Sequence, residues 1–100
     1  MLDYNRIPVP AHAEGMRYYM ELGIPPGSFL QALLENDLME ACRRADSDNQ
    51  KKFYEWARWL HTEAPVGSYG SRKNVEAWMI ARRNEHKEQD DEDDVGGLIF

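Results

Sequence analysis

The sequence predicts an all-α fold: a compact bundle of four to five short helices with a disordered acidic C-terminal tail. Apolar residues recur at helical spacing over most of the chain, and no segment shows the alternation that is typical of strands. Clusters of Pro, Gly, Ser and Asp separate these helical segments. A chain of 100 residues has room for one hydrophobic core. We therefore divide it into an extended N-terminal arm (1–10), a helical domain (11–87) and an acidic tail with a hydrophobic tip (88–100).

The first elements are bounded by proline and glycine. Pro8 and Pro10 favour an extended arm without a regular element. A helix over about 11–22 follows, and Gly23 is placed to end it. After two further prolines, Ser28 can cap a second helix by accepting a hydrogen bond from an amide of its first turn.

The rest of the helical domain is predicted from its apolar stripes and caps. The stripe that begins after Ser28 extends to Ala45, and Asn36-Asp37 can split it into two helices in one line. Asp46 starts the next helix. Its expected buried stripe consists of Phe53, Trp56, Ala57 and Leu60. Ser71 caps a last helix, whose apolar pattern fades beyond Arg83.

The net charge of −6 belongs to the tail. All 12 basic residues and 12 of the 18 acidic residues lie within residues 1–87, so this part is formally neutral. The other six acids lie between Glu88 and Asp94, where mutual repulsion opposes compact structure. A neutral body argues against direct nucleic-acid binding.

The sequence also indicates in which compartment the protein is expected and whether it crosses a membrane. The single cysteine, Cys42, lies on an apolar stripe, where we expect it to be a buried packing residue. The N-terminus has no signal-peptide pattern, so we expect a cytoplasmic protein. No apolar run approaches the roughly 18 to 20 residues that cross a bilayer. Oligomeric state is left open, since the aromatics Tyr18, Tyr54 and Trp59 suit a core, a pocket lining or a dimer interface.

No set of residues predicts a metal centre, a cofactor or an enzyme active site. The three histidines are scattered and form no pair with metal-ligand spacing. The carboxylates Glu35, Asp37 and Glu40 stand close in sequence and could in principle perform acid-base chemistry, but solvated acids are common on helix surfaces. We therefore predict a non-enzymatic protein without a cofactor.

The Gly- and Ser-containing loop before the last helix is a candidate anion site. Its amides and hydroxyls could hold a phosphate beside two basic side chains. It lacks the Gly-Lys-Ser/Thr ending and the preceding strand of a nucleotide-triphosphate loop, so helix capping is the favoured interpretation. The residues of the candidate anion or nucleotide site are Ser68, Tyr69, Ser71, Arg72 and Lys73.

Several short motifs between residues 11 and 80 recur in a pattern found in other small proteins. They are Gly23–Leu30, Asn36-Asp37-Leu38, Arg44-Ala45-Asp46, Trp59-Leu60, Ala64-Pro65, Gly70-Ser71 and Trp78. In these motifs the chain resembles small helical proteins encoded by bacteriophages and prophages. The resemblance implies a phage setting and a helical fold without transferring any catalytic residue. Small phage proteins often bind host proteins, including components of host defence, so the resemblance implies an interaction role.

The tail continues from the acids of residues 90–94 through two glycines to Leu98-Ile99-Phe100. In this it resembles the acidic tips of bacterial single-stranded-DNA-binding proteins, which end in a terminal Phe. It departs from that pattern, because glycines and Leu-Ile, without the usual proline, precede the terminal residue. An apolar tip can enter a pocket while the acids steer it to a basic surface. A sliding-clamp peptide and a merely solubilising tail are the competing interpretations. The residues expected to contact a partner are Asp90, Asp91, Glu92, Asp93, Asp94, Leu98, Ile99 and Phe100.

These observations predict an interaction protein that binds and modulates a host DNA-processing or defence protein. The expected partner is a host protein with a basic, pocketed surface. Two alternatives remain open. One is a small-molecule protein that binds a nucleotide signal through the loop before the last helix. The other is an acidic mimic of DNA, against which the neutral body counts.

Overall fold

The computed structural model describes residues 2–98, with side chains for residues 2–86. It confirms the all-α prediction, and residues 2–98 contain no strand. The described residues form six α-helices, one more than the four to five expected, because α4 is a single turn separate from α5. Their bounds are α1 Ala13–Leu22, α2 Ser28–Leu34, α3 Leu38–Arg44, α4 Ser47–Gln50, α5 Phe53–Glu63 and α6 Arg72–Leu98.

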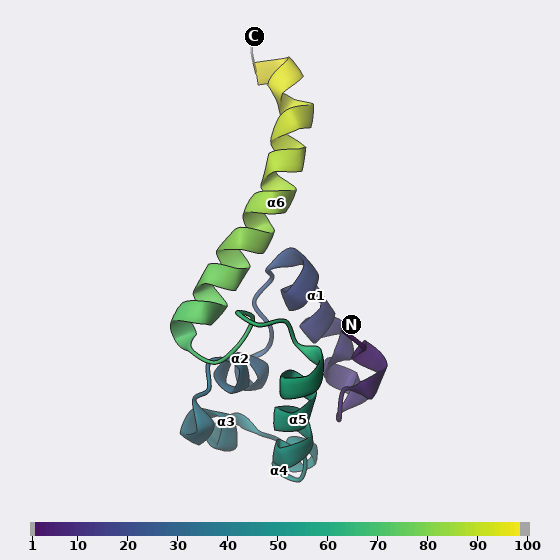
Figure 1. The fold of residues 1–100 in the computed structure, drawn as a ribbon, viewed down its shortest axis with the longest axis vertical. Helices are drawn as coiled ribbons and strands as arrows, with labels where there is room; N and C mark the ends of the chain where they lie inside the picture. Colours follow the sequence, from purple (N-terminus) through teal and green to yellow (C-terminus); the bar gives the residue numbers. More distant parts are fainter. Residues whose placement is uncertain (1, 99–100) are drawn as a thin grey trace.

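The helices form a small body from which α6 extends (Figure 1). α1 packs against the first part of α6, and α2 contacts both α3 and α6. α5 stands across from α2 and α3, with α4 at the end of the body farthest from the C-terminal end of α6 (Figure 1). The length of α6 gives the molecule principal extents of 56 × 25 × 22 Å. The predictions for the tail (88–100), including its disorder and its partner-binding residues, lie outside the residues whose side chains are described.

The core is built around the fully buried indole of Trp56. Its ring meets Phe29, Trp59 and His12 at steep angles, with ring centroids 6.1, 6.4 and 6.0 Å away. Such edge-to-face contacts are favoured by the ring quadrupoles and add to the free energy of burial. The other large buried side chains come from α1, α2 and α6, and include Tyr19, Met16, Leu30, Leu34 and Val75.

A buried amide ties α4 and α5 to the N-terminal segment. Trp56 Nε1, which can only donate, bonds to Asn49 Oδ1 at 2.9 Å. The Asn49 amide nitrogen must then face His12 Nε2, 2.9 Å away. Since that amide nitrogen donates, His12 Nε2 accepts, and the neutral imidazole carries its hydrogen on Nδ1. One side chain thus satisfies polar atoms from two distant parts of the chain.

Most predicted helix boundaries are confirmed. Gly23 ends α1 with a left-handed φ of 71°, and its N–H donates to the carbonyl of Tyr19. Asp46 and Ser71 accept hydrogen bonds from the amides of Asn49 and Asn74, at 2.9 and 3.0 Å. These signals are local, because a side chain three residues before an amide can reach it in any protein.

The predicted split between α2 and α3 is confirmed, but the two helices pack against each other and do not follow one line. Asn36 adopts a left-handed φ of 63°, a conformation that asparagine tolerates better than most residues. Asp37 then caps α3 by accepting from the amide of Glu40 at 3.2 Å. The prediction that Ser28 caps α2 is wrong. Ser28 is the first helical residue, and Gly27 occupies the N-cap position without a side-chain hydrogen bond.

Two further predictions are wrong. The N-terminal segment is not an extended arm, since it forms 3-10 turns over Tyr4–Arg6 and Pro10–His12 and buries Ile7 in the core. It is also bonded to α5, because Trp59 Nε1 donates to the Asp3 carbonyl at 3.0 Å. Cys42 is exposed rather than buried, because Ala41 is the buried residue of the short helix α3 and the C-cap residue Ala45 follows it into the core.

A substitution of Gly23 should destabilise the protein, because the end of α1 lies very close to α6. A Cβ atom there would lie 2.5 Å from the Met79 carbonyl oxygen and 2.9 Å from Arg82 Cβ. Gly23→Ala should therefore lower the free energy of unfolding by about 2 kcal/mol or more, since the left-handed conformation alone costs about 1–2 kcal/mol. Gly15→Ala is the matched control, since nothing lies within 4 Å of its Cβ position. It should raise stability by roughly 0.5–1 kcal/mol in urea titrations. Equal effects of the two substitutions would contradict this packing.

Removing the buried amide of Asn49 should lower the free energy of unfolding by more than the loss of so small a side chain would suggest. Asn49→Ala leaves Trp56 Nε1 buried without an acceptor, and an orphaned buried donor costs about 1–3 kcal/mol. The exposed Asn84 supplies the control, because Asn84→Ala should change stability by less than about 0.5 kcal/mol. The measurement is the free energy of unfolding from urea titration. An Asn49→Ala protein as stable as Asn84→Ala would rule out the network.

Candidate functional site

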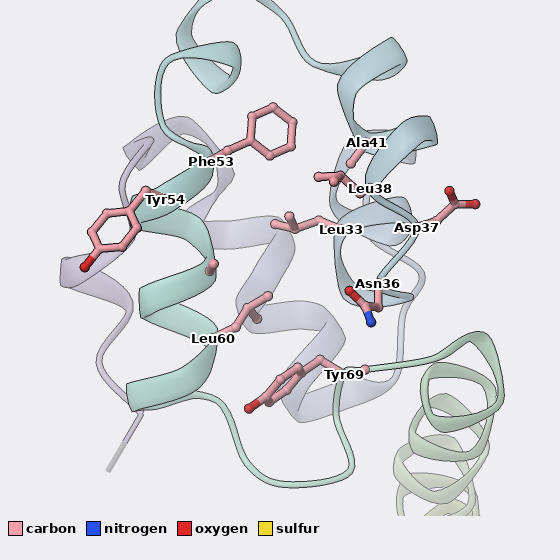
Figure 2. Close-up of a pocket in the computed structure, with 11 residues that line it drawn as sticks. Leu33, Asn36, Asp37, Leu38, Ala41, Phe53, Tyr54, Leu60 and Tyr69 are labelled. Carbon is pink, nitrogen blue, oxygen red and sulfur yellow. The ribbon is translucent and has the colours of Figure 1, made fainter.

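A cavity of about 430 Å³ opens between α3 and α5 (Figure 2). Its volume lies in the range of about 300–1,000 Å³ that is usual for ligand pockets. The walls are predominantly apolar, as is also usual for such pockets. We call this cavity the α3–α5 groove. Its lining residues are Leu33, Asn36, Asp37, Leu38, Ala41, Phe53, Tyr54, Ala57, Leu60, Tyr69 and Gly70.

The burial of Trp56 fixes which face of α5 forms a wall of the groove. With Trp56 turned into the core, the neighbouring face of the helix presents Phe53, Tyr54, Ala57 and Leu60 to the groove. Ala57 is exposed, which corrects its predicted place in the buried stripe. Its methyl group leaves space in the middle of the wall that a larger side chain would fill. Tyr54 stands at the rim with 73% of its surface exposed.

The opposite wall consists of Leu33 from α2 and of Leu38 and Ala41 from α3. The turn between these helices fixes it, since Asp37 N donates to the Ala32 carbonyl at 2.9 Å and the Asp37 carboxylate caps α3. Leu38 is consequently the first residue of α3 and remains 59% exposed, facing the cavity across from α5 (Figure 2). The two rims of the groove therefore carry exposed apolar side chains.

The polar groups of the groove are few. They comprise Asn36, Asp37, the hydroxyls of Tyr54 and Tyr69 and the backbone of Gly70. The carboxylate of Asp37 points away from the cavity (Figure 2) and is engaged by the amide of Glu40. The lining contains no Lys, Arg or His. The groove thus favours uncharged apolar groups and offers no counter-charge to a phosphate.

The loop before α6 is held rigidly, and its predicted anion-binding groups are occupied. Ser68 is fully buried, and its hydroxyl donates to the Pro65 carbonyl at 2.7 Å. The Ser68 carbonyl accepts from the Tyr19 hydroxyl at 2.7 Å, and Gly70 N donates to the Leu34 carbonyl at 2.7 Å. These bonds fix the position from which Tyr69 reaches the groove.

The structure does not bring the five residues of the candidate anion site to one open surface. Ser68 lies in the interior, Tyr69 lines the groove, and Ser71 caps α6. Arg72 is paired with Glu76 at 3.2 Å, and Lys73 is exposed beside it. The capping interpretation is confirmed for Ser71. The loop does contribute to the candidate site, through an aromatic ring that faces apolar neighbours.

The three carboxylates considered for acid-base chemistry all have local partners. Glu35 accepts from Gln31 Nε2 at 3.2 Å, and Asp37 caps α3. Glu40 receives two hydrogen bonds from Arg43, each 2.9 Å long, and these lower the pKa of its carboxyl below the ordinary value. They therefore form helix-surface interactions, and none of them faces a nucleophile in the groove.

A second, polar cleft of about 350 Å³ lies on the other side of α5. Its lining combines the cations Arg6, Lys52 and Arg58 with the acids Glu55 and Glu63. Arg6 already lies 3.7 Å from a Glu63 carboxylate oxygen, so part of the positive charge is neutralised. The mixture of charges gives the cleft no clear preference for an anion or a cation.

The groove was not predicted from the sequence, although one signal pointed to it. Of the three surplus aromatics, Trp59 belongs to the core and Tyr18 lies under the Arg17 guanidinium. Tyr54 alone is both highly exposed and part of the groove. The available indication was that this helix carries more aromatic residues than one buried stripe needs. The facing wall belongs to another helix, α3, whose orientation relative to α5 the sequence does not specify.

Comparison with protein-family models, with characterised proteins and with solved structures finds no match. Within the part of the chain that the structure describes, no group of His, Cys, Asp and Glu is placed to hold a metal ion. No described helix has the length and apolar character needed to span a membrane.

Two tyrosines with buried hydroxyl groups, Tyr4 and Tyr19, should lower the stability of the fold at high pH. Burial, with a further contribution from Glu21, raises the pKa of Tyr4 from 10.0 to about 12, and burial also raises the pKa of Tyr19. The folded state thus favours the neutral phenols. The contribution of these two groups to the free energy of unfolding is complete below about pH 10. It is lost as the pH rises toward the folded-state pKa values.

Urea titrations at increasing alkaline pH should show this decline. Tyr19→Phe loses the bond to the Ser68 carbonyl, at a cost of about 1 kcal/mol, but its stability should fall less steeply with pH. Tyr4→Phe should flatten the decline as well. The exposed Tyr54 provides the control, and Tyr54→Phe should follow the wild-type curve. A wild-type slope in both Tyr4→Phe and Tyr19→Phe would contradict the assignment.

Proposed function

We propose that this chain is a non-enzymatic interaction protein and that the α3–α5 groove is its recognition surface. The observation that carries the proposal is the pair of exposed apolar side chains, Leu38 and Tyr54, on opposite rims of an apolar groove. Apolar surface of this kind is often a protein interaction site. A partner side chain that entered the groove would be surrounded by both rims, as an anchor residue is in a binding hot spot.

The chemistry of the lining supports binding rather than catalysis. Its eleven residues include no Ser, Cys, His or Lys that could act as a nucleophile or base. The carboxylate of Asp37 caps a helix and points out of the cavity (Figure 2). An apolar lining with few polar groups suits a partner that contributes buried aliphatic or aromatic side chains.

The resemblance to phage proteins makes a host protein the partner we expect, with DNA-processing and defence proteins as the leading classes. The acidic tail would then provide a second contact, on a basic surface of the same partner. Two contacts on one chain strengthen binding when both can be engaged together. The groove supplies apolar anchoring in this scheme, and the tail supplies electrostatic steering.

A small apolar molecule is the second candidate occupant. The volume of the groove and the fixed position of its loop wall favour it. A nucleotide is a weaker candidate, because no cation lines the cavity. A thermal-shift panel separates these possibilities, since a ligand that binds only the folded protein raises its melting temperature.

Substitution of Leu38 should remove partner binding without unfolding the protein. Leu38→Asp places a charge on the groove rim, at the first residue of α3, where the helix dipole tolerates an acid. Ile80→Asp is the matched control, because Ile80 is an aliphatic residue of similar exposure on α6. Affinity capture from bacterial lysate, quantified by mass spectrometry, should show recovery of the specific partner reduced by at least about tenfold for Leu38→Asp alone.

Two results would count against this proposal. Equal recovery of the partner by Leu38→Asp and Ile80→Asp would place the recognition surface elsewhere. Stabilisation by a small apolar compound, together with no captured protein, would favour the second candidate. Circular dichroism of both variants verifies that the helices are intact.

A further inference from the structure

The contact between His12 and Asn49 holds only while one nitrogen of the imidazole is unprotonated. Trp56 Nε1 donates to Asn49 Oδ1 at 2.9 Å, so the Asn49 amide nitrogen faces His12 Nε2, also at 2.9 Å. An amide nitrogen can only donate, and a protonated imidazole has no acceptor. We propose that His12 is an acid-sensitive latch. When Nε2 takes up a proton, the contact breaks and the N-terminal segment (residues 2–12) loosens from α4 and α5.

The Asn49 amide cannot resolve this conflict by turning over. A rotation by half a turn presents its oxygen to the protonated imidazole, but it also places the amide nitrogen against Trp56 Nε1, which only donates. Trp56 is fully buried and Asn49 has 1% of its surface exposed, so water does not replace the lost partner. One of the two buried contacts is therefore lost in either orientation.

A proton can reach His12, and no acid pairs with the resulting charge. His12 is half-buried against the rings of Phe29 and Trp56, whose centroids each lie 6.0 Å from that of the imidazole. None of the ion pairs among the described residues involves His12, and α2 has no charged side chain. The loss of the Asn49 contact is therefore not offset by an ion pair. The charged groups that adjoin the packed residues in the other elements are Glu14 of α1, Asp46 and Asp48 at the start of α4, and Lys52 and Glu55 at the start of α5.

Other polar contacts hold the opposite end of the N-terminal segment to α5. Trp59 Nε1 donates to the Asp3 carbonyl, and Asp3 N donates to Glu63 Oε1, each at 3.0 Å. Among the described residues, the one hydrogen bond from this segment to α4 is that of His12. Proton uptake therefore removes the attachment to α4 and leaves the attachment at Asp3. The segment also forms part of the wall of the polar cleft beside α5, so its loosening in acid opens that cleft.

Urea titrations of the full-length protein between about pH 7.5 and 5.5 test the latch. In an unfolded chain histidine takes up a proton near pH 6.5, roughly in the middle of this range, while carboxylates remain largely ionised. The chain has three histidines, so His61→Gln/His86→Gln leaves His12 as the only one. In this background the contribution of the latch is complete at the upper pH and is lost as the pH falls. The equilibrium constant for unfolding should rise by a factor that approaches about tenfold.

Adding His12→Gln to this background gives the decisive comparison. The glutamine side chain can place an oxygen near the position of His12 Nε2 and accept from Asn49 at every pH. The acid-induced rise in the unfolding constant should therefore disappear, while the protein stays folded at neutral pH. His12→Phe supplies no acceptor, so it should be less stable than His12→Gln at neutral pH and equally insensitive to acid. His61→Gln alone, at an exposed position, should keep the wild-type response.

Hydrogen exchange read by mass spectrometry locates the response. After correction for the pH dependence of the intrinsic rate, amides of residues 2–12 should exchange faster than those of α5, and acid should accelerate them by a factor that approaches about tenfold. His12→Gln should abolish this acceleration.

Two results would overturn the inference. The first is a wild-type acid response in His12→Gln. The second is exchange of residues 2–12 that is no faster than that of α5, because acid would then unfold the whole domain rather than release one segment. Neither result bears on the α3–α5 groove, which capture of a partner at neutral pH tests separately.

Discussion

The burial of Trp56 with its indole nitrogen satisfied is the constraint on which the rest of the structure depends. A fully buried indole must find an acceptor, and here the acceptor is the side chain of Asn49. That amide can serve only if α4 packs closely against α5 and if His12 approaches from the N-terminal segment. One hydrogen-bonded side chain thus fixes the relative positions of three segments that are separate in the sequence.

The groove is a consequence of the same constraint. With Trp56 directed inward, α5 must turn Tyr54 and Ala57 toward α3. α2 and α3 have seven residues each and are separated by the Asn36-Asp37 turn, so they form a bent wall that does not close against α5. The cavity therefore lies between this bent wall and the face of α5 that carries Tyr54 and Ala57.

The sequence predicted those features that depend on near neighbours. The caps at Asp46 and Ser71 and the end of α1 at Gly23 follow from hydrogen bonds that span three or four residues. Predictions failed where tertiary packing chooses between equivalent positions. On a helix as short as α3, periodicity cannot decide whether Ala41 or its neighbour Cys42 faces the core. The groove could not be predicted for the same reason, since its existence depends on the relative orientation of two helices.

The rigidity of the groove bears on how it could recognise a partner. Tyr69 is held by a loop that is bonded to Tyr19 and Leu34, and Leu38 is held by the capped start of α3. These walls lose little conformational freedom when a side chain enters, so most of the apolar free energy remains available for binding. An apolar surface that is preformed in this way costs hydrophobic free energy while it is empty. A chain that keeps Leu38 and Tyr54 exposed across such a groove has the physical properties expected of a recognition site.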